Sequence, residues 1–284
     1  GEDHAAARYQ YRDAFAEAWG RTLYGGLTRW CEERGTQSIG HFLEHGLGYL
    51  HPELCAGNMF QLLKHSSMGG IDAVFRQFVA GQRITQDHPV WQTPKLGSSV
   101  SHAYGKRDDI AMVEIYGARG QDVTYPEMKW WADHMHVSGV SFLIPHSFNP
   151  RAPRDTDCPP YFYNGGFEPR WPLYRVLADY SSRLSTVLAG GRHVCPVALL
   201  FVGTSAHEGR YVAPDDLSAA LQDALLDCDW IPYEVLEGDM KVEGPELALR
   251  DERYRVLIVP PVEVIPVATL AKAREFLEAG GVVV

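Results

Sequence analysis

The sequence predicts an α/β fold in two segments, each built around a parallel sheet. Short apolar runs alternate with helical patterns, and no hairpin turn separates them, which is typical of strands joined by crossover helices. The pattern restarts after the stretch GGRH at residues 190–193. The length of 284 residues is that of roughly two domains. We therefore predict one domain over residues 1–192 and a second over residues 193–284.

The first segment is predicted to begin with a helix over 9–34, where apolar residues recur at helical spacing until Gly35. Four strands are expected next, over 38–43, 71–75, 110–116 and 140–145. The helices between and after them are expected over 96–104, 125–137 and 173–188. The helix over 125–137 has Thr124 as its N-cap and Pro126 in its first turn, two residue types that favour helix initiation.

The second segment opens with a continuous apolar run over 194–202, as expected of a strand that is covered on both faces. Further strands are expected over 231–236, 255–259 and 282–284. Helices over 214–226 and 267–279 complete the pattern. This alternation predicts a small doubly wound α/β domain.

The charge balance limits the partners that the protein can have. Acidic residues outnumber basic ones by 36 to 26, which gives a net charge of −10. Such a surface repels a phosphate backbone and an anionic membrane, so we expect no nucleic acid and no membrane as partners. No apolar run approaches the ~20 residues of a membrane-spanning helix. A neutral or cationic substrate stays open, and the sequence indicates no cellular compartment.

The cysteine and histidine patterns do not predict a metal site. The five cysteines are scattered without a CxxC pair, and we interpret them as reduced thiols that behave as small apolar residues. His134 and His136 stand two apart in a predicted helix, so their side chains point to different sides.

Polar and aromatic residues gather where the predicted strands of the first segment end. Functional side chains of parallel α/β sheets lie at this carboxyl edge. Two carboxyl groups there, with histidines and rings, suit a carbohydrate site, because glycosidic cleavage uses one protonated and one ionised carboxyl group. The candidate catalytic residues are Glu114 and Glu44. The candidate substrate-binding residues are His41, His45, Tyr116, His146, Tyr163 and Asn164.

Several of these residues also have a structural interpretation. Glu114 lies in an apolar stretch, where an ionised carboxylate needs a partner, so a structural ion pair is the alternative. Glu44 could face solvent at the start of a loop. His146 could be a hydrogen-bonded core histidine, and the aromatic loop around Tyr163 could simply pack over the end of the sheet.

Three stretches, SSVSHAYGK, AMVEIYG and TYPEMKWWADHMHVSGVSFLIPHSF, resemble the C-terminal half of a glycoside hydrolase (β/α)8 barrel. The similarity is to the α-L-rhamnosidase-type group, glycoside hydrolase family 106 and its relatives. The stretch WPLYRVLADYSSRLSTVLAGGRHVCPVALLF resembles their last barrel helix and the passage into the next domain. That domain resembles the flavodoxin-like, glutamine-amidotransferase-like module of family 42 β-galactosidases.

This resemblance implies the C-terminal half of a TIM barrel, strands five to eight, followed by a flavodoxin-like domain. It implies a glycosidase of α-L-rhamnosidase type, with a β-galactosidase-like hydrolase as the alternative. Glu114, at the end of strand seven, would be the nucleophile of a retaining enzyme or the base of an inverting one. The general acid commonly follows strand four, which would precede residue 1. Within this chain, Glu44 is the candidate for the general acid, and it could equally bind a sugar hydroxyl. Rhamnosidase-type relatives can use calcium, but no ligand cluster in this sequence supports it, and we expect no cofactor.

Four strands cannot close a barrel, which takes ~250 residues. We therefore expect a segment of a longer protein that is a poor enzyme alone. A non-catalytic carbohydrate-binding or assembly protein on the same scaffold is the alternative from another class. In the second segment, Cys195 begins a strand and Cys228 follows a helix, so neither matches an amidotransferase nucleophile. The resemblance instead implies that this domain supports a homo-oligomer.

Overall fold

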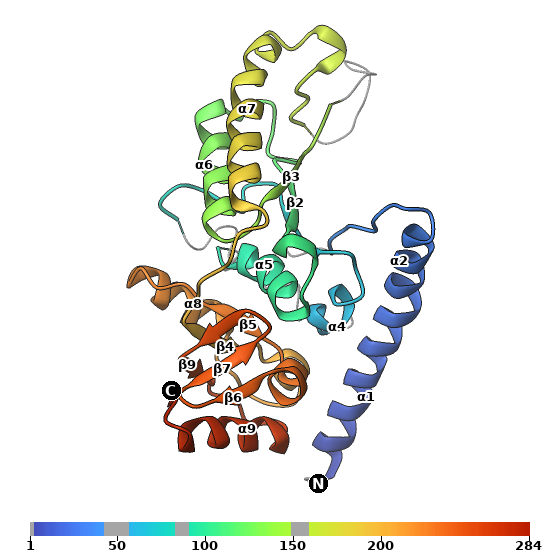
Figure 1. Cartoon of the computed structure of the whole chain (residues 1–284). Helices are drawn as coiled ribbons and strands as arrows, with labels where there is room; N and C mark the ends of the chain where they lie inside the picture. Colours follow the sequence, from blue (N-terminus) through green and yellow to red (C-terminus); the bar gives the residue numbers. More distant parts are fainter. Residues whose placement is uncertain (1–2, 43–56, 83–90, 149–158) are drawn as a thin grey trace.

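The structure, a computed structural model, describes residues 3–42, 57–82, 91–148 and 159–284. It contains two parallel sheets, which confirms the predicted α/β class. Figure 1 shows the first sheet with helices α6 and α7 in the upper half of the molecule and the second sheet in the lower half. Helix α5 lies between the halves, and a long N-terminal helix runs along one side.

The first sheet has three parallel strands in the order β1-β2-β3. They are β1 (Gly69–Ala73), β2 (Ala111–Ile115) and β3 (Phe142–Pro145). The helices that alternate with and follow them are α5 (Thr93–Tyr104), α6 (Tyr125–Val137) and α7 (Trp171–Leu188). One face of the sheet, including Ile71 and Val113, packs against α6 and α7 in a core that also holds Trp131 and Leu177. Three of the four predicted strands are therefore confirmed.

Local capping explains where these helices begin and end. The Thr124 side chain accepts a hydrogen bond from the backbone N–H of Glu127, whose carboxylate accepts one from the Thr124 backbone N–H. This reciprocal pair satisfies two N–H groups that a helix start leaves open, so α6 begins where the sequence predicts. Helix α5 ends at Gly105, which takes the left-handed conformation (φ 59°) that favours glycine.

The strand predicted over 38–43 is wrong for its described part. Residues 38–42 have no regular secondary structure. The backbone N–H of Ser67 donates to the carbonyl of Ser38 at 3.0 Å, and the carbonyl of Gly40 lies against Gly70 of β1. The segment thus runs beside the first sheet but does not form the ladder of backbone hydrogen bonds that would make it a strand. Whether the three strands belong to a barrel stays a prediction.

The N-terminal arm is helical, as predicted. Its elements are α1 (Asp3–Trp19), a π-helical turn (Gly20–Tyr24) and α2 (Gly25–Glu32). The arm packs on the short helix α4 (Met59–Leu63). A Cβ atom on Gly20 would overlap the carbonyl oxygen of Gln61. Glycine at this position therefore allows the two helices to approach closely.

The second sheet is parallel, with the order β10-β9-β4-β5. Its strands are β4 (Val197–Leu200), β5 (Asp229–Ile231), β9 (Val256–Ile258) and β10 (Val282–Val283), and its helices are α8 (Pro214–Asp223) and α9 (Val267–Glu278). When these four strands are numbered along the chain, their order across the sheet is 2-1-3-4. The first four strands of a flavodoxin-like sheet have the same order. The flavodoxin-like assignment itself stays a prediction.

The predicted strand over 231–236 is misplaced, because β5 ends at Ile231 and Val235–Asp239 forms a π-helical turn. A three-stranded antiparallel sheet was also not predicted. Its strands are β6 (Lys241–Glu243), β7 (Glu246–Leu249) and β8 (Glu252–Tyr254). Two-residue turns connect these strands, with positive φ at Gly244 and Arg250. Strands of three or four residues are too short to show a clear alternation of apolar and polar residues in the sequence.

Helix α5 is buried on all sides because it packs against both sheets. Its Leu96 and Val100 belong to the same hydrophobic core as Trp230 of β5. The hydroxyl of Ser99 accepts a hydrogen bond from the Trp230 backbone N–H at 2.8 Å, and that of Ser101 accepts one from the Gly69 backbone N–H at 3.0 Å. The core thus crosses the domain boundary predicted at residue 192, which itself stays a prediction.

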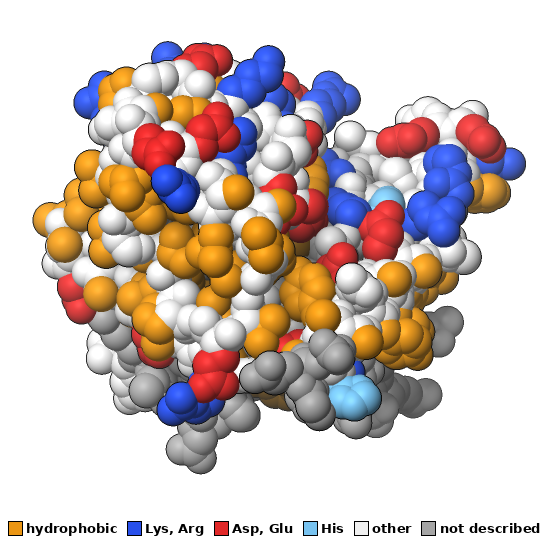
Figure 2. Space-filling model, turned by 90° about the horizontal axis from the view of Figure 1, so that it is seen from below, with side chains coloured by type: hydrophobic (Ala, Val, Ile, Leu, Met, Phe, Trp, Pro, Cys, Tyr) orange, Lys and Arg blue, Asp and Glu red, His pale blue; other side chains and the backbone are white. Residues whose placement is uncertain are grey.

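The outer surface of the lower half is partly apolar. On α9, Val267, Leu270 and Leu277 are exposed. Figure 2 shows the molecule from below, with hydrophobic side chains spread between charged ones on this face. Among the described helices, none combines the length and apolar character needed to cross a bilayer.

Candidate active site

Two carboxyl groups lie side by side on the first sheet. Asp72 of β1 and Glu114 of β2 are register partners in the parallel pairing of these strands. Their neighbours Ile71 and Val113 point into the core on the helix side. Since side chains alternate along a strand, Asp72 and Glu114 both point to the opposite face of the sheet. Neighbouring strands lie ~4.8 Å apart, so the two groups are close enough to interact.

His41 binds Glu114 directly. Its Nε2 lies 2.9 Å from Oε2 of Glu114, and its Nδ1 lies 2.9 Å from the carbonyl oxygen of Phe42. The same Nδ1 is 3.9 Å from Oδ2 of Asp72. A carbonyl and a carboxylate only accept, so both ring nitrogens act as donors and the ring is the imidazolium cation. The predicted site residues His41 and Glu114 are thus brought together.

The surroundings of Glu114 favour its ionised form. The hydrogen bond from His41 lowers the pKa of Glu114, the positive charges of His41 and His146 lower it further, and partial burial opposes them. The side chain is 33% exposed, so it can also be reached from outside. Glu114 is therefore an accessible carboxylate.

The surroundings of Asp72 favour its protonated form. Burial raises the pKa of Asp72, and the negative charge of Glu114 raises it further. The positive charge of His41 lowers it, and the result of the three effects is a pKa of about 7. Its side chain is only 6% exposed, and its Oδ1 is buried without a hydrogen-bond partner. A carboxyl group that keeps its proton near neutral pH fits these surroundings.

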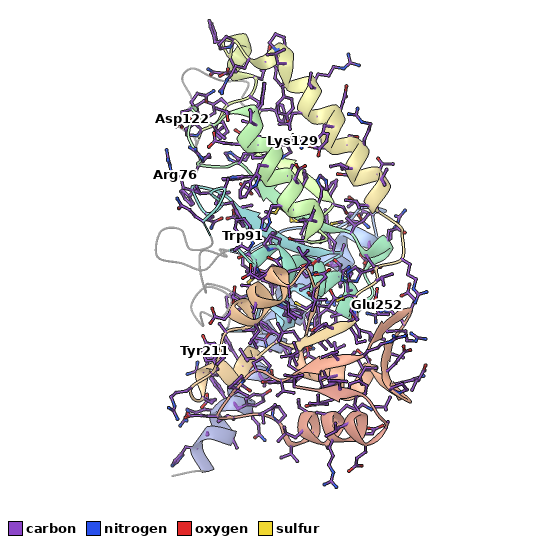
Figure 3. The ribbon with its side chains drawn as sticks, turned by 90° about the vertical axis from the view of Figure 1, so that its left-hand side faces the viewer. Arg76, Trp91, Asp122, Lys129, Tyr211 and Glu252 are labelled. Carbon is purple, nitrogen blue, oxygen red and sulfur yellow. The ribbon has the colours of Figure 1, made fainter. Side chains whose placement is uncertain are left out.

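Asp72 was not predicted from the sequence. Arg76 and Gln77, the polar residues that follow β1 closely, do not join Asp72 and Glu114. The structure shows Arg76 exposed and 3.7 Å from Asp122, as the labelled side chains in Figure 3 illustrate. Gln77 is buried, and its Oε1 accepts from the backbone N–H of Val74 at 2.9 Å. The available signal was an acidic residue inside an apolar strand, where an ionised group is costly.

His146 follows β3 and lies at the same edge as Glu114. Its backbone N–H donates to the carbonyl of Ile115 at 2.9 Å, which holds it against the end of β2. Its side chain packs beside Gly117 and is near enough to Glu114 to act on its pKa. The structure therefore places His146 where the sequence predicted it.

Tyr116 lies elsewhere. Its side chain is 2% exposed, its hydroxyl donates to the carbonyl of Met128 at 2.9 Å, and its ring packs against Trp131 and Phe162. The residue has positive φ (78°) at the end of β2. The expectation that Tyr116 shapes the site is thus corrected, because its ring is part of the core on the helix side.

Tyr163 and Asn164 lie in an aromatic cluster at the start of α7. The Tyr163 ring meets that of Trp171 edge-on, with centroids 5.4 Å apart, and is partly exposed. Oδ1 of Asn164 is buried without a hydrogen-bond partner. Within the described ranges, the structure shows no contact between this pair and Glu114. Glu44 and His45 lie outside the described residues.

The described residues do not fit calcium. The group of three potential metal ligands found among them is His102, His193 and Asp229, which lies away from the strand ends discussed above. Two imidazoles and one carboxylate are not the set of six to eight oxygens that calcium prefers. No step of the proposed chemistry is therefore assigned to calcium.

The cysteines of the second segment do not form a nucleophilic site. Cys195 and Cys228 are both buried. Burial raises the pKa of the Cys195 thiol, and it raises that of the Cys228 thiol to about 11. Neither thiol is therefore a thiolate at neutral pH.

Comparison with known proteins gives a likeness of fold. No family model matches the sequence, and the curated proteins contain no match. Among solved structures, that of a rhamnosidase from Novosphingobium sp. PP1Y is similar, with a TM-score of 0.74 and 20% sequence identity. The similarity covers 97% of this chain and 26% of that chain. The chain therefore shares its fold with about a quarter of that rhamnosidase.

Proposed function

We propose that this chain is part of a glycoside hydrolase whose catalytic carboxyl groups are Glu114 and Asp72. The observation that carries the proposal is the pairing of these residues on neighbouring strands with opposite pKa shifts. Glycosidases need one carboxyl group that keeps its proton and one that is ionised, and such environments separate the two roles. The similarity in fold to a rhamnosidase structure supports the same class.

Each residue has a role that follows from its surroundings. Glu114, ionised and accessible, either attacks the anomeric carbon as the nucleophile or acts as the base that deprotonates the attacking water. Asp72, protonated, donates its proton to the oxygen of the leaving group. His41 is a positioning residue, because its hydrogen bond fixes the Glu114 carboxylate and keeps it ionised. His146 lies at the same edge of the sheet. Glu44 stays the alternative acid.

The proposed substrate is an α-L-rhamnoside. A solved structure that resembles this chain is that of a rhamnosidase. The same comparison gives no support to a β-galactoside. A neutral sugar also agrees with a protein of net charge −10, which does not attract anions.

One observation favours the second candidate function, non-catalytic carbohydrate binding. The Asp72 side chain is 6% exposed, so its proton is shielded from a sugar that approaches from solvent. A protein with this arrangement could bind a sugar through Glu114 and the histidines without cleaving it.

The test uses aryl and alkyl glycosides with the protein that carries this chain. Wild type is expected to cleave an α-L-rhamnoside, and Glu114→Gln is expected to lose ~10²–10⁴-fold in kcat. Asp72→Asn should lose more on an alkyl rhamnoside than on a nitrophenyl rhamnoside, because nitrophenolate leaves without protonation. Glu263→Gln, which removes an exposed carboxylate of the second segment, is the matched control.

The outcomes separate the two candidates. Sugar binding in calorimetry without turnover of any glycoside supports the binding protein. Full activity of Glu114→Gln contradicts the assignment of Glu114, whichever sugar is cleaved. Equal losses of Asp72→Asn on both leaving groups would contradict the acid role of Asp72.

We further propose that the second segment serves assembly of a homo-oligomer. The exposed apolar residues Val267, Leu270 and Leu277 on α9 support this role, because an exposed apolar patch is a common interface feature.

A further inference from the structure

A buried cluster of charged and imidazole groups lies where the two halves of the molecule meet. It draws residues from four elements, and no part of the proposed glycosidase chemistry uses it. Its members are Lys95 and His102 of α5, His193 of the connection after α7, Asp227 and Asp229 at β5, and Glu252 of β8. In Figure 3, Glu252 lies near mid-height of the molecule, between the upper and lower halves.

Three ligand atoms in this cluster converge. One nitrogen each of His102 and His193 and a carboxylate oxygen of Asp229 all lie within 4.8 Å of one another. Nδ1 of His102 is 2.9 Å from Oδ1 of Asp229, and Nδ1 of His193 is 3.3 Å from Oδ2. Two ligands on one tetrahedral zinc ion, with bonds of ~2.0 Å, lie ~3.3 Å apart. The His193–Asp229 spacing equals this value, and the His102–Asp229 spacing is 0.4 Å shorter.

A fourth oxygen faces the same point. Oε1 of Glu252 lies 3.5 Å from Nδ1 of His193. Both atoms are buried, and neither makes a hydrogen bond. The Glu252 side chain is only 5% exposed, so water does not satisfy this oxygen. An imidazole nitrogen and a carboxylate oxygen that face each other without a hydrogen bond leave room for a cation between them.

The other nitrogen of His193 has the partner that a metal-binding histidine needs. Nε2 of His193 lies 3.4 Å from Oδ2 of Asp227. Metal-binding histidines donate their second N–H to a carboxylate, which fixes the tautomer and raises the basicity of the ligating nitrogen. With the proton on Nε2, the lone pair of Nδ1 points toward Asp229 and Glu252, two acceptors. Either a bound cation or a second proton, on Nδ1, makes such an arrangement favourable.

The charges of the cluster balance with a divalent ion. Nζ of Lys95 lies 2.9 Å from Oδ1 of Asp227, and these two charges neutralise each other. Asp229 and Glu252 leave two negative charges beside two imidazoles. A divalent cation balances them with both rings neutral.

Without an ion, the imidazoles themselves must supply the charge. His102 and His193 are stacked, with ring centroids 4.1 Å apart and planes inclined by 23°. Two imidazolium cations in this arrangement repel each other, so full charge balance without a metal is unfavourable.

We propose that this cluster is a binding site for a divalent transition-metal ion of the Zn²⁺ class, with His102, His193 and Asp229 as ligands and Glu252 as the fourth. Imidazole and carboxylate ligands suit zinc. The ion enters through a hollow of about 330 Å³ that His102, His193 and Asp227 help to line. Because the ligands come from both halves of the molecule, its role is structural: it fastens α5 to the second segment.

The test is titration of the chelator-treated chain with Zn²⁺ in a calorimeter. Wild type is expected to bind one ion per chain and to unfold at a higher temperature with Zn²⁺ than without it. His193→Gln and Glu252→Gln should each bind ~100-fold more weakly or not at all, and their unfolding temperatures should not respond to Zn²⁺. His136→Gln is the matched control, since His136 lines the same hollow outside the cluster. It should bind Zn²⁺ as wild type does.

X-ray absorption of the zinc-loaded wild type tests the ligands without a variant that could fail to fold. Two imidazole ligands and no sulfur are expected. A sulfur ligand would place the ion on a cysteine and overturn the proposal. It is also overturned if wild type binds no stoichiometric Zn²⁺, or if His193→Gln and Glu252→Gln both bind as wild type does. In the metal-free chain, two N–H protons on His193 together with no uptake of Zn²⁺ would identify an imidazolium ion pair instead.

Discussion

Asp72 and Glu114 occupy paired positions on neighbouring parallel strands, yet one carboxyl group is buried and the other is a third exposed. The two groups also differ in their contacts with the segment before β1. His41, which lies in that segment, donates its hydrogen bond to Glu114 and reaches Asp72 only at 3.9 Å. His41 therefore stabilises the ionised form of Glu114, whereas burial keeps Asp72 protonated.

Replacement of His41 by glutamine is expected to raise the pKa of Glu114. The hydrogen bond and positive charge of His41 lower that pKa, and burial, which remains in the variant, raises it. The carboxyl carbon of Glu114, followed by NMR over pH, reports the change directly. In an active enzyme the acidic limb of the profile of kcat/KM should shift upward with it. A Glu114 pKa that does not move would contradict the role of His41.

Asp72→Asn is expected to stabilise the fold at alkaline pH. The Asp72 carboxyl ionises near 3.8 in the unfolded chain and at about 7 in the folded one. Between these values the folded state binds more protons, so wild type loses free energy of unfolding as pH rises from about 4 to 7. The amide of the variant does not ionise in this pH range. The variant therefore keeps the roughly 2–4 kcal/mol of unfolding free energy that wild type loses. Urea unfolding at pH 5 and pH 8 should show that the difference in the free energy of unfolding between variant and wild type increases with pH. The same difference at both pH values would contradict the raised pKa of Asp72.

Gly20→Ala is expected to destabilise the protein by about 1–3 kcal/mol, because the added methyl group overlaps the carbonyl oxygen of Gln61. Gly26→Ala is the matched control. Gly26 lies in α2 of the same arm, and a Cβ atom added there would meet no other atom within 4 Å. That variant should be neutral or more stable by about 0.5–1 kcal/mol, since alanine favours helix. Equal effects of the two substitutions in thermal unfolding would show that the close approach of α4 is unimportant.

The assembly role of the second segment predicts that charge on α9 lowers the oligomeric state. In Val267→Lys and Leu270→Lys, a charged group replaces an exposed apolar one and must be desolvated at any interface. Sedimentation velocity should show oligomers for wild type and monomers for the variants. Val187→Lys, at an equally exposed position on α7, should leave the state unchanged. A monomeric wild type contradicts the proposal.

The sequence predicted elements well where local signals agree. The helix over 125–137 was located to the residue because a capping box, a first-turn proline and Gly139 act within one segment. The strand over 38–43 failed because strand formation depends on a partner, and residues 38–42 make one backbone–backbone hydrogen bond with the described residues beside them, from the Ser67 N–H to the Ser38 carbonyl. The short strands β6 to β8 were missed because three or four residues show no clear alternation.

The candidate site was predicted in part. His41, Glu114 and His146 meet as expected, because strand ends of a parallel sheet share one edge. Asp72 was missed because its significance lies in its register with Glu114, which no local pattern encodes. The same holds for the cluster around Asp229, whose members are up to 157 positions apart between Lys95 and Glu252.

Helix α5, packed between both sheets, also constrains how this gene can evolve. Its Leu96 and Ser99 complete the surface of the second segment, although they precede residue 193 by about a hundred positions. Recombination that exchanges the coding sequence after residue 192 for a foreign module would leave α5 facing a surface that does not fit it. We expect the two halves to be inherited together, with substitutions around Trp230 accompanied by changes in α5.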